Sequence, residues 1–337
     1  MRSAMRETTA TPVASTRART RRRAALGGRD VAAYLFVLPL TAIFALFYLW
    51  PAISTILSSF FSWGLLQPWR LTDPDSWDFV GLGNYQDALN DPDFWSAAVN
   101  TAIWLVVFPA LVTGFALLVS ILIWYAGRGA GLYRSVFILP MTISLTAAGV
   151  IWSFIYNPDP SIGLLNALTG LLGLGDTHLW LSDLGSIHLG GIELRLVNLS
   201  LVVAAFWAFA GFGVITFTAG LASVSQELVE AARVDGARVS QIVRYVLLPA
   251  LRRPIIVVVV VSVIFALRVF DIVFVMTQGG PVQDTMVLAL LLWQDAFAFL
   301  DTPSAGLAAA IAVLLSAALV LGAYPYLREL TRSGARR

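Results

Sequence analysis

Long apolar runs alternate with short polar stretches along most of this chain. Each run is near or above the ~20 residues with which a helix crosses a bilayer, and few charged residues interrupt it. The pattern predicts an all-α transmembrane protein, a six-helix polytopic bundle. The predicted spans cover about 32–60, 98–125, 133–156, 196–221, 254–276 and 304–327.

Two apolar stretches between these spans, 164–174 and 286–299, are too short to cross. We expect both to be interfacial or plug-like helices on the outer face, and the second could instead be re-entrant. Residues 30–330 are predicted to form one transmembrane domain. Residues 1–29 form a basic tail with too few apolar residues to fold, and residues 331–337 form a second tail.

Composition supports a membrane protein and excludes several kinds of chemistry. The chain is 58% hydrophobic and only 12% charged, roughly half the charged fraction of a soluble protein. It has no cysteine, and His178 and His188 share one loop without other ligands nearby, so we expect no metal site. No catalytic set of residues emerges. All basic residues are arginine, so a P-loop lysine is absent and this chain is no P-loop ATPase.

Charge also predicts orientation. Arginines concentrate in residues 1–29, in 222–253 and in the C-terminal tail, whereas 61–97, 157–195 and 277–303 are acidic. The positive-inside rule then places both termini and 222–253 in the cytoplasm. Because the use of arginine alone as the basic residue indicates a GC-rich bacterial genome, we expect a multi-pass protein of a bacterial cytoplasmic membrane. The small net charge of +2, distributed in this way, does not indicate nucleic-acid binding.

The segment 223–254 is the longest strongly polar run between apolar segments. Ser225 can cap a helix that stops at Gly236, and Ser240 can begin a second one that ends before Pro249. A helix lined by small residues at a membrane surface can enter a cleft of another protein. A solvated connecting loop is the alternative.

Polar and aromatic residues within the spans are candidates for function. Arg268 and Asp271 lie three apart in the fifth predicted span, where a helix would let them pair. We favour a structural or gating pair over substrate contact; snorkelling at the outer end and a proton relay are alternatives. Ser262 could bind a ligand or its own helix backbone. Aromatic side chains at the end of the third span and within the fourth could stack on sugar rings or simply pack. They are Trp152 and Tyr156 in the third, and Phe206, Trp207, Phe209 and Phe212 in the fourth.

Several motifs together resemble the permease subunits of binding-protein-dependent ABC importers. Residues 230–237, EAARVDGA, followed by Leu248-Pro249, are similar to the EAA loop of that family. Further similarity to its sugar-importing branch lies in FVGLGNY at 79–85, Asn100-Thr101, the approach to Pro140, and the stretch from Phe270-Asp271 through Gly279-Gly280-Pro281 to Thr285. The family often has proline where this chain has Ser225.

The resemblance implies a carbohydrate permease subunit with a cytoplasmic EAA coupling helix between helices 4 and 5. It implies a second homologous permease, two ATPase subunits that bind ATP and magnesium, and an extracytoplasmic solute-binding protein as partners in the bilayer. This chain would then bind no cofactor and would not be an enzyme. The implied coupling residues are Glu227, Glu230, Ala231, Ala232, Asp235 and Gly236. The implied substrate-pathway residues are Trp152, Tyr156, Phe209, Phe212 and Ser262.

Other functions remain as alternatives. An ion-coupled secondary transporter would show inverted repeats, which we do not find. A permease for a non-sugar solute such as glycerol phosphate would share the coupling loop and differ in its substrate site. A membrane scaffold or receptor would need no central cavity.

Overall fold

The computed structural model describes residues 33–334 except 65, 67, 128, 176, 183, 190–191 and 299–303. The predictions for residues 1–29 lie outside this range. The chain divides into two units, residues 1–55 and 56–337. In the first, the chain is helical from Ala33, through η1 (Ala45–Leu49) into α2 (Trp50–Ser58). The side chains described there are almost all exposed, as a lipid-facing helix requires.

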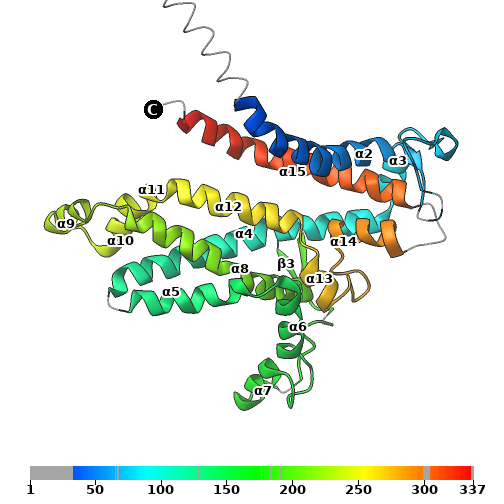
Figure 1. Cartoon of the computed structure of the whole chain (residues 1–337). Helices are drawn as coiled ribbons and strands as arrows, with labels where there is room; N and C mark the ends of the chain where they lie inside the picture. Colours follow the sequence, from blue (N-terminus) through cyan, green and yellow to red (C-terminus); the bar gives the residue numbers. More distant parts are fainter. Residues whose placement is uncertain are drawn as a thin grey trace, which may run out of the picture. The chain divides into compact units, whose positions relative to one another are not determined.

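Three helices pack side by side at the centre of the second unit: α4 (Pro92–Ala126), α8 (Leu196–Ala222) and α12 (Arg252–Leu267) (Figure 1). Asp91 caps α4 by accepting a hydrogen bond from the Asp93 amide at 2.8 Å. A side chain on Gly213 would place its Cβ 2.6 Å from the Ala116 Cβ, so α8 and α4 can approach this closely only because residue 213 is glycine.

The third predicted span, 133–156, is wrong as a single helix. α5 (Ala130–Ile138) continues into η3 (Leu139–Thr142), and the chain then bends by 101° into α6 (Leu145–Ile155). Pro140 lies in η3, and Ser144 begins α6 by accepting a hydrogen bond from the Ala147 amide at 3.2 Å. Figure 1 shows α6 running across the direction of the central helices.

The fifth predicted span, 254–276, also differs from the structure. Ahead of it, α10 (Val239–Ile242), η4 (Val243–Leu247) and α11 (Leu248–Ala250) form one helical stretch that bends by 69° into α12. This helical stretch therefore runs past Pro249 to Ala250 rather than ending before Pro249. α12 ends at Leu267, and the short helix α13 (Asp271–Met276) follows.

Short elements connect the long helices of the second unit. Strands β1 (Phe61–Ser62) and β2 (Asp78–Phe79) pair antiparallel, with Phe61 opposite Phe79, and η2 (Pro74–Ser76) lies between them. α3 (Gly83–Asn90) precedes α4, and α7 (Leu164–Leu171) precedes the antiparallel hairpin of β3 (Ser186–Leu189) and β4 (Ile192–Arg195). The last elements described are α14 (Leu288–Trp293), η5 (Gln294–Ala298) and α15 (Ala305–Gly334). The helix α9 (Gln226–Val234) lies beyond the C-terminal end of α8 (Figure 1).

In the described part of the chain, three helices are long and apolar enough to cross a membrane: Ala33–Ser58, Pro92–Ala126 and Leu196–Ala222. Counting each bent pair as one span gives up to five. α15 coincides with the sixth predicted span, but its side chains are described only as far as Val320. The all-α transmembrane fold is confirmed, and six crossings stay a prediction.

Candidate functional site

The predicted coupling segment forms a helix with one packed side and one free side. α9 begins after Ser225, whose backbone is extended as in a cap, but the Ser225 side chain makes no capping hydrogen bond. Gly236 ends the turn with φ of 79°, and its amide donates to the Arg233 carbonyl oxygen at 3.0 Å. Glycine adopts this backbone conformation without steric cost, which explains the stop at this position.

One buried side chain anchors α9 to the rest of the protein. Val229 is 3% exposed and packs in a cluster with Leu221 at the end of α8 and with Ile242, Leu247 and Leu251. Of the six predicted coupling residues, only Ala232 is partly buried against this cluster. The other five are exposed: Glu227, Glu230, Ala231, Asp235 and Gly236.

The free side of α9 also carries apolar residues that we did not predict as functional. Leu228 is 61% exposed and Val234 is 87% exposed, next to the exposed carboxylates of Glu227 and Glu230. Exposed apolar side chains within a polar rim are typical of a protein interaction surface. The sequence could have predicted this exposure, because both residues are apolar and lie outside the apolar spans in a short polar helix.

The predicted substrate-pathway residues fall into two groups. Phe209 of α8 lies among Phe108 of α4 and Phe265 of α12, with ring centroids 5.5 and 4.8 Å away, and Phe212 lies 5.5 Å from Phe209. Ser262 is fully buried, and its hydroxyl has no hydrogen-bond partner among the described residues. These rings therefore pack against one another within this subunit, which is the alternative that we considered for them.

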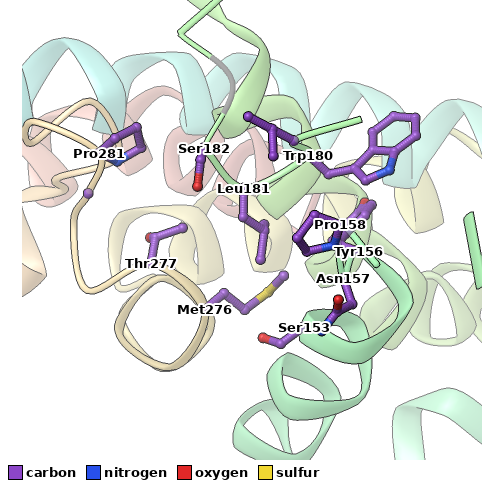
Figure 2. A pocket seen from close by; sticks show the side chains of 12 residues that line it. Ser153, Tyr156, Asn157, Pro158, Trp180, Leu181, Ser182, Met276, Thr277 and Pro281 are labelled. Atoms are coloured by element: carbon purple, nitrogen blue, oxygen red, sulfur yellow. The ribbon is translucent and has the colours of Figure 1, made fainter. Parts of the chain in front are cut away.

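The second group, Trp152 and Tyr156, lies at the end of α6. Their ring centroids are 5.0 Å apart, and the Tyr156 hydroxyl donates to the Ser200 carbonyl oxygen of α8 at 3.0 Å. Tyr156 is one wall of a cavity of about 440 Å³, which we call the α6 cavity. Figure 2 shows its lining residues: Ser153, Tyr156, Asn157, Pro158, Leu179, Trp180, Leu181, Ser182, Met276, Thr277, Gly280 and Pro281.

One buried asparagine organises the loop that forms much of this cavity. The Asn166 side-chain nitrogen donates to the carbonyl oxygens of Asn157, Pro158 and His178 at 2.9, 3.2 and 3.0 Å. Its side-chain oxygen accepts from the His178 amide at 3.1 Å and from the Trp180 indole at 3.0 Å. These bonds fix the residues on both sides of α7. In the sequence, this role was indicated only by the presence of an asparagine within the apolar stretch 164–174.

The loop between α13 and α14, residues 277–287, is held by amides from two central helices. Asn100 of α4 donates to the carbonyl oxygens of Asp284 and Met286 at 3.0 and 2.9 Å. Asn198 of α8 donates to the Asn100 side-chain oxygen at 3.1 Å and to the Asp284 carbonyl oxygen at 2.9 Å. Arg195 forms an ion pair with Asp284 at 3.5 Å. The structure thus joins two segments that the sequence analysis singled out separately, Asn100-Thr101 and the Gly-Gly-Pro stretch.

The predicted intramembrane ion pair is not formed. Within the described part of the chain, no ion pair joins Arg268 to Asp271, and both residues are exposed in this subunit. The helix ends at Leu267 and restarts at Asp271, so the two side chains no longer share a helix face. An ion pair is formed elsewhere, between Arg195 and Asp284 of the loop 277–287.

The described residues contain no group of three or more His, Asp or Glu that could hold a metal ion. The His178 ring lies 5.4 Å from the Trp180 ring and so belongs to the loop's packing. The side chain of His188 lies outside the described residues.

Comparison with known proteins agrees with these features. The family described as "Binding-protein-dependent transport system inner membrane component" matches residues 28–333. The chain is 32% identical over 285 residues to an osmoprotective compounds uptake permease of Synechocystis, covering 83% of this chain and 93% of the relative. It is 31% identical over 304 residues to the sn-glycerol-3-phosphate transport system permease UgpA of Yersinia pestis, covering 89% and 95%.

Solved structures show the same fold. A bacterial ABC transporter involved in the import of the acidic polysaccharide alginate matches with a TM-score of 0.71 and 21% identity, covering 91% of this chain and 99% of that one. The alginate transporter in complex with its alginate pentasaccharide-bound periplasmic protein matches with a TM-score of 0.68 and 18% identity, covering 87% and 92%. The match of the family to nearly the whole chain shows that this protein belongs to it and is an ABC transporter permease.

Proposed function

We propose that this member of the binding-protein-dependent permease family is one subunit of an ATP-driven carbohydrate importer. It forms half of a translocation pathway with a second, homologous permease. An extracytoplasmic solute-binding protein delivers the sugar, and two ATPase subunits in the cytoplasm bind magnesium and ATP. The chain itself carries out no covalent chemistry.

The observation that carries this proposal is the free side of α9. Its exposed Glu227 and Glu230 carboxylates lie beside the bare Leu228 and Val234 side chains, which a partner's cleft would cover. α9 follows directly from α8, whose 27 residues span about 40 Å. The α6 cavity and α9 lie toward opposite ends of α8, since Tyr156 bonds to Ser200 near the start of that helix. This separation suits an outer solute entrance and an inner coupling helix.

Two rival functions receive less support. A proton relay through Arg268 and Asp271 would need the two side chains to interact, and they do not. Glycerol phosphate transport is supported by the name of the Yersinia pestis relative. A phosphate group usually meets arginine or lysine in its site, and neither is found among the described residues that line the α6 cavity.

The proposal is tested by reconstituting the complete transporter in proteoliposomes. We expect Glu230→Arg to lower binding-protein-stimulated ATP hydrolysis and sugar uptake by about tenfold, since charge reversal in a docked helix costs on the order of 1–3 kcal/mol. Asp75→Arg makes the same charge change at an exposed residue of another loop and should leave both activities unchanged. Full activity of the Glu230→Arg transporter would refute docking through α9. Uptake that an ionophore abolishes and that ignores ATP would refute the importer class.

A further inference from the structure

The α6 cavity combines two aromatic rings with uncharged polar groups. The Tyr156 and Trp180 ring centroids are 6.0 Å apart, and hydroxyl and amide groups lie on the walls around them. Among the described residues of the lining, no side chain carries a charge. Its volume of about 440 Å³ falls in the range of ~300–1,000 Å³ that is usual for small-molecule sites.

The cavity has two walls that belong to different parts of the fold. Figure 2 shows Tyr156, Asn157 and Trp180 on one side and Thr277 and Pro281 on the other. The first wall is fixed by Asn166, which accepts the indole N–H of Trp180 at 3.0 Å and so sets the orientation of that ring. The second wall belongs to the loop that Asn100 and Asn198 hold.

Hydrogen-bonding capacity remains free on the first wall. The Asn157 side-chain oxygen accepts from the Asp159 amide at 2.9 Å, while its side-chain nitrogen has no partner among the described residues. The Ser182 hydroxyl is exposed and likewise has no hydrogen bond within the described chain. By contrast, the hydroxyls of Tyr156 and Thr277 already bond to Ser200 and Val273. A ligand that brings its own hydroxyls and an apolar face would use both the rings and these free groups.

We infer that the α6 cavity is a binding site for a neutral pyranose unit, occupied on the path between the solute-binding protein and the membrane interior. This inference rests on the proposed carbohydrate transport and adds the location and the charge of the ligand. Trp180 supplies the ring face, and Asn157 and Ser182 supply hydrogen bonds. Anionic sugars are disfavoured, because the described part of the lining contains no cationic side chain and Arg195 is paired with Asp284.

The absence of cysteine from this chain allows a direct test. In the assembled transporter, Ser182→Cys and Ser153→Cys place thiols on the loop and on α6, and Ser161→Cys places one on an exposed turn outside the cavity. Each is treated with two methanethiosulfonates, one carrying glucose and one carrying an ethyl group. The measurement is the ratio of the two reaction rates at each position. Methyl α-glucoside is then added in excess as a competitor.

We expect the glucose-to-ethyl rate ratio at Ser182→Cys and Ser153→Cys to exceed that at Ser161→Cys by roughly tenfold. The competitor should remove this excess, and Trp180→Ala should reduce it. Because Trp180→Ala could also disturb the loop through Asn166, Asn157→Ala serves as a second variant. Equal ratios at all three positions would overturn the inference. So would thiols at 182 and 153 that react in the isolated chain but not in the transporter, since the partner permease would then fill the cavity.

The same proteoliposomes separate this inference from the proposed function. ATP hydrolysis stimulated by the solute-binding protein tests coupling and is measured on the transporter with the unchanged permease, before any thiol is introduced. If hydrolysis is coupled and the rate ratios are equal, only the cavity assignment fails. If the ratios favour glucose and no binding protein stimulates hydrolysis, the importer assignment fails instead.

Discussion

Replacing Asn100 by leucine should loosen the loop 277–287 without opening the core. Asn100 is 6% exposed, and its side chain makes three hydrogen bonds. Two go to the carbonyl oxygens of Asp284 and Met286, and the third comes from Asn198. Leucine has the same branched skeleton of side-chain heavy atoms as asparagine, so it still fills the site on α4 while all three bonds are lost.

The magnitude follows from these bonds. Each ordinary hydrogen bond contributes about 1 kcal/mol net, so the loss of three costs about 3 kcal/mol. Asn198 keeps its bond to the Asp284 carbonyl oxygen, which limits the additional penalty for unpaired groups. Since every 1.4 kcal/mol is a factor of ten, local opening of the loop should become roughly 100-fold more frequent.

Hydrogen exchange measured by mass spectrometry on the purified transporter is the appropriate assay. The amides of Asp284 and Thr285 are bonded to the carbonyl oxygens of Pro281 and Gly279, so they exchange when the loop opens. Peptides from 277–287 should exchange roughly 100-fold faster in Asn100→Leu, whereas peptides from the middle of α8 should not change. Asn90→Leu, at an exposed position, is the control. A change below about threefold in the loop, or an equal change throughout α8, would refute the reasoning.

Three further outcomes are expected. Gly236→Val should reduce binding-protein-stimulated ATP hydrolysis severalfold, because a branched residue at φ of 79° is strained by about 1–2 kcal/mol, and Gly236→Asn should restore most of it. Gly213→Ala should lower the melting temperature, as overpacking costs about 1–3 kcal/mol, while Gly114→Ala, whose Cβ would meet nothing within 4 Å, should not. Burial, with Asp91 and Asp93 nearby, raises the pKa of Asp295 to about 6. The folded state therefore favours the protonated acid, and the free energy of unfolding should fall as pH rises from about 4 through 6. Asp295→Asn should abolish this dependence of the melting temperature on pH.

The length of the apolar runs predicted most of the helices, because any helix that spans a bilayer needs such a run. It could not reveal the bend at residues 143–144. Pro140 and Ser144 carry the local signals for a break, since proline restricts the residue before it and serine caps a new helix. Both residues lie inside a long apolar run, and hydropathy alone does not distinguish one straight helix from two helices at 101°.

The helix α9 was more predictable from the sequence than the residues around the cavity. Its signals are local: a glycine at its end, one carboxylate in its first turn, and polarity between apolar spans. The Asn166 network depends on carbonyl groups from residues 157 to 178, and the Asn100–Asn198 contact joins residues 98 positions apart. Contacts of that kind follow from the tertiary fold. The same reason explains the error at Arg268 and Asp271, whose predicted pairing assumed an unbroken helix.

The helix α8 connects both walls of the α6 cavity to α9. Ser200 accepts the hydroxyl of Tyr156 on one wall, and Asn198 holds the loop that forms the other. At the opposite end of α8, Leu221 packs with Val229 of α9. We expect α8 to move as a rod, so that a displacement of α9 would reach Asn198 and Ser200. Because the walls contact the rod through different residues on separate elements, such a movement can change the distance between them.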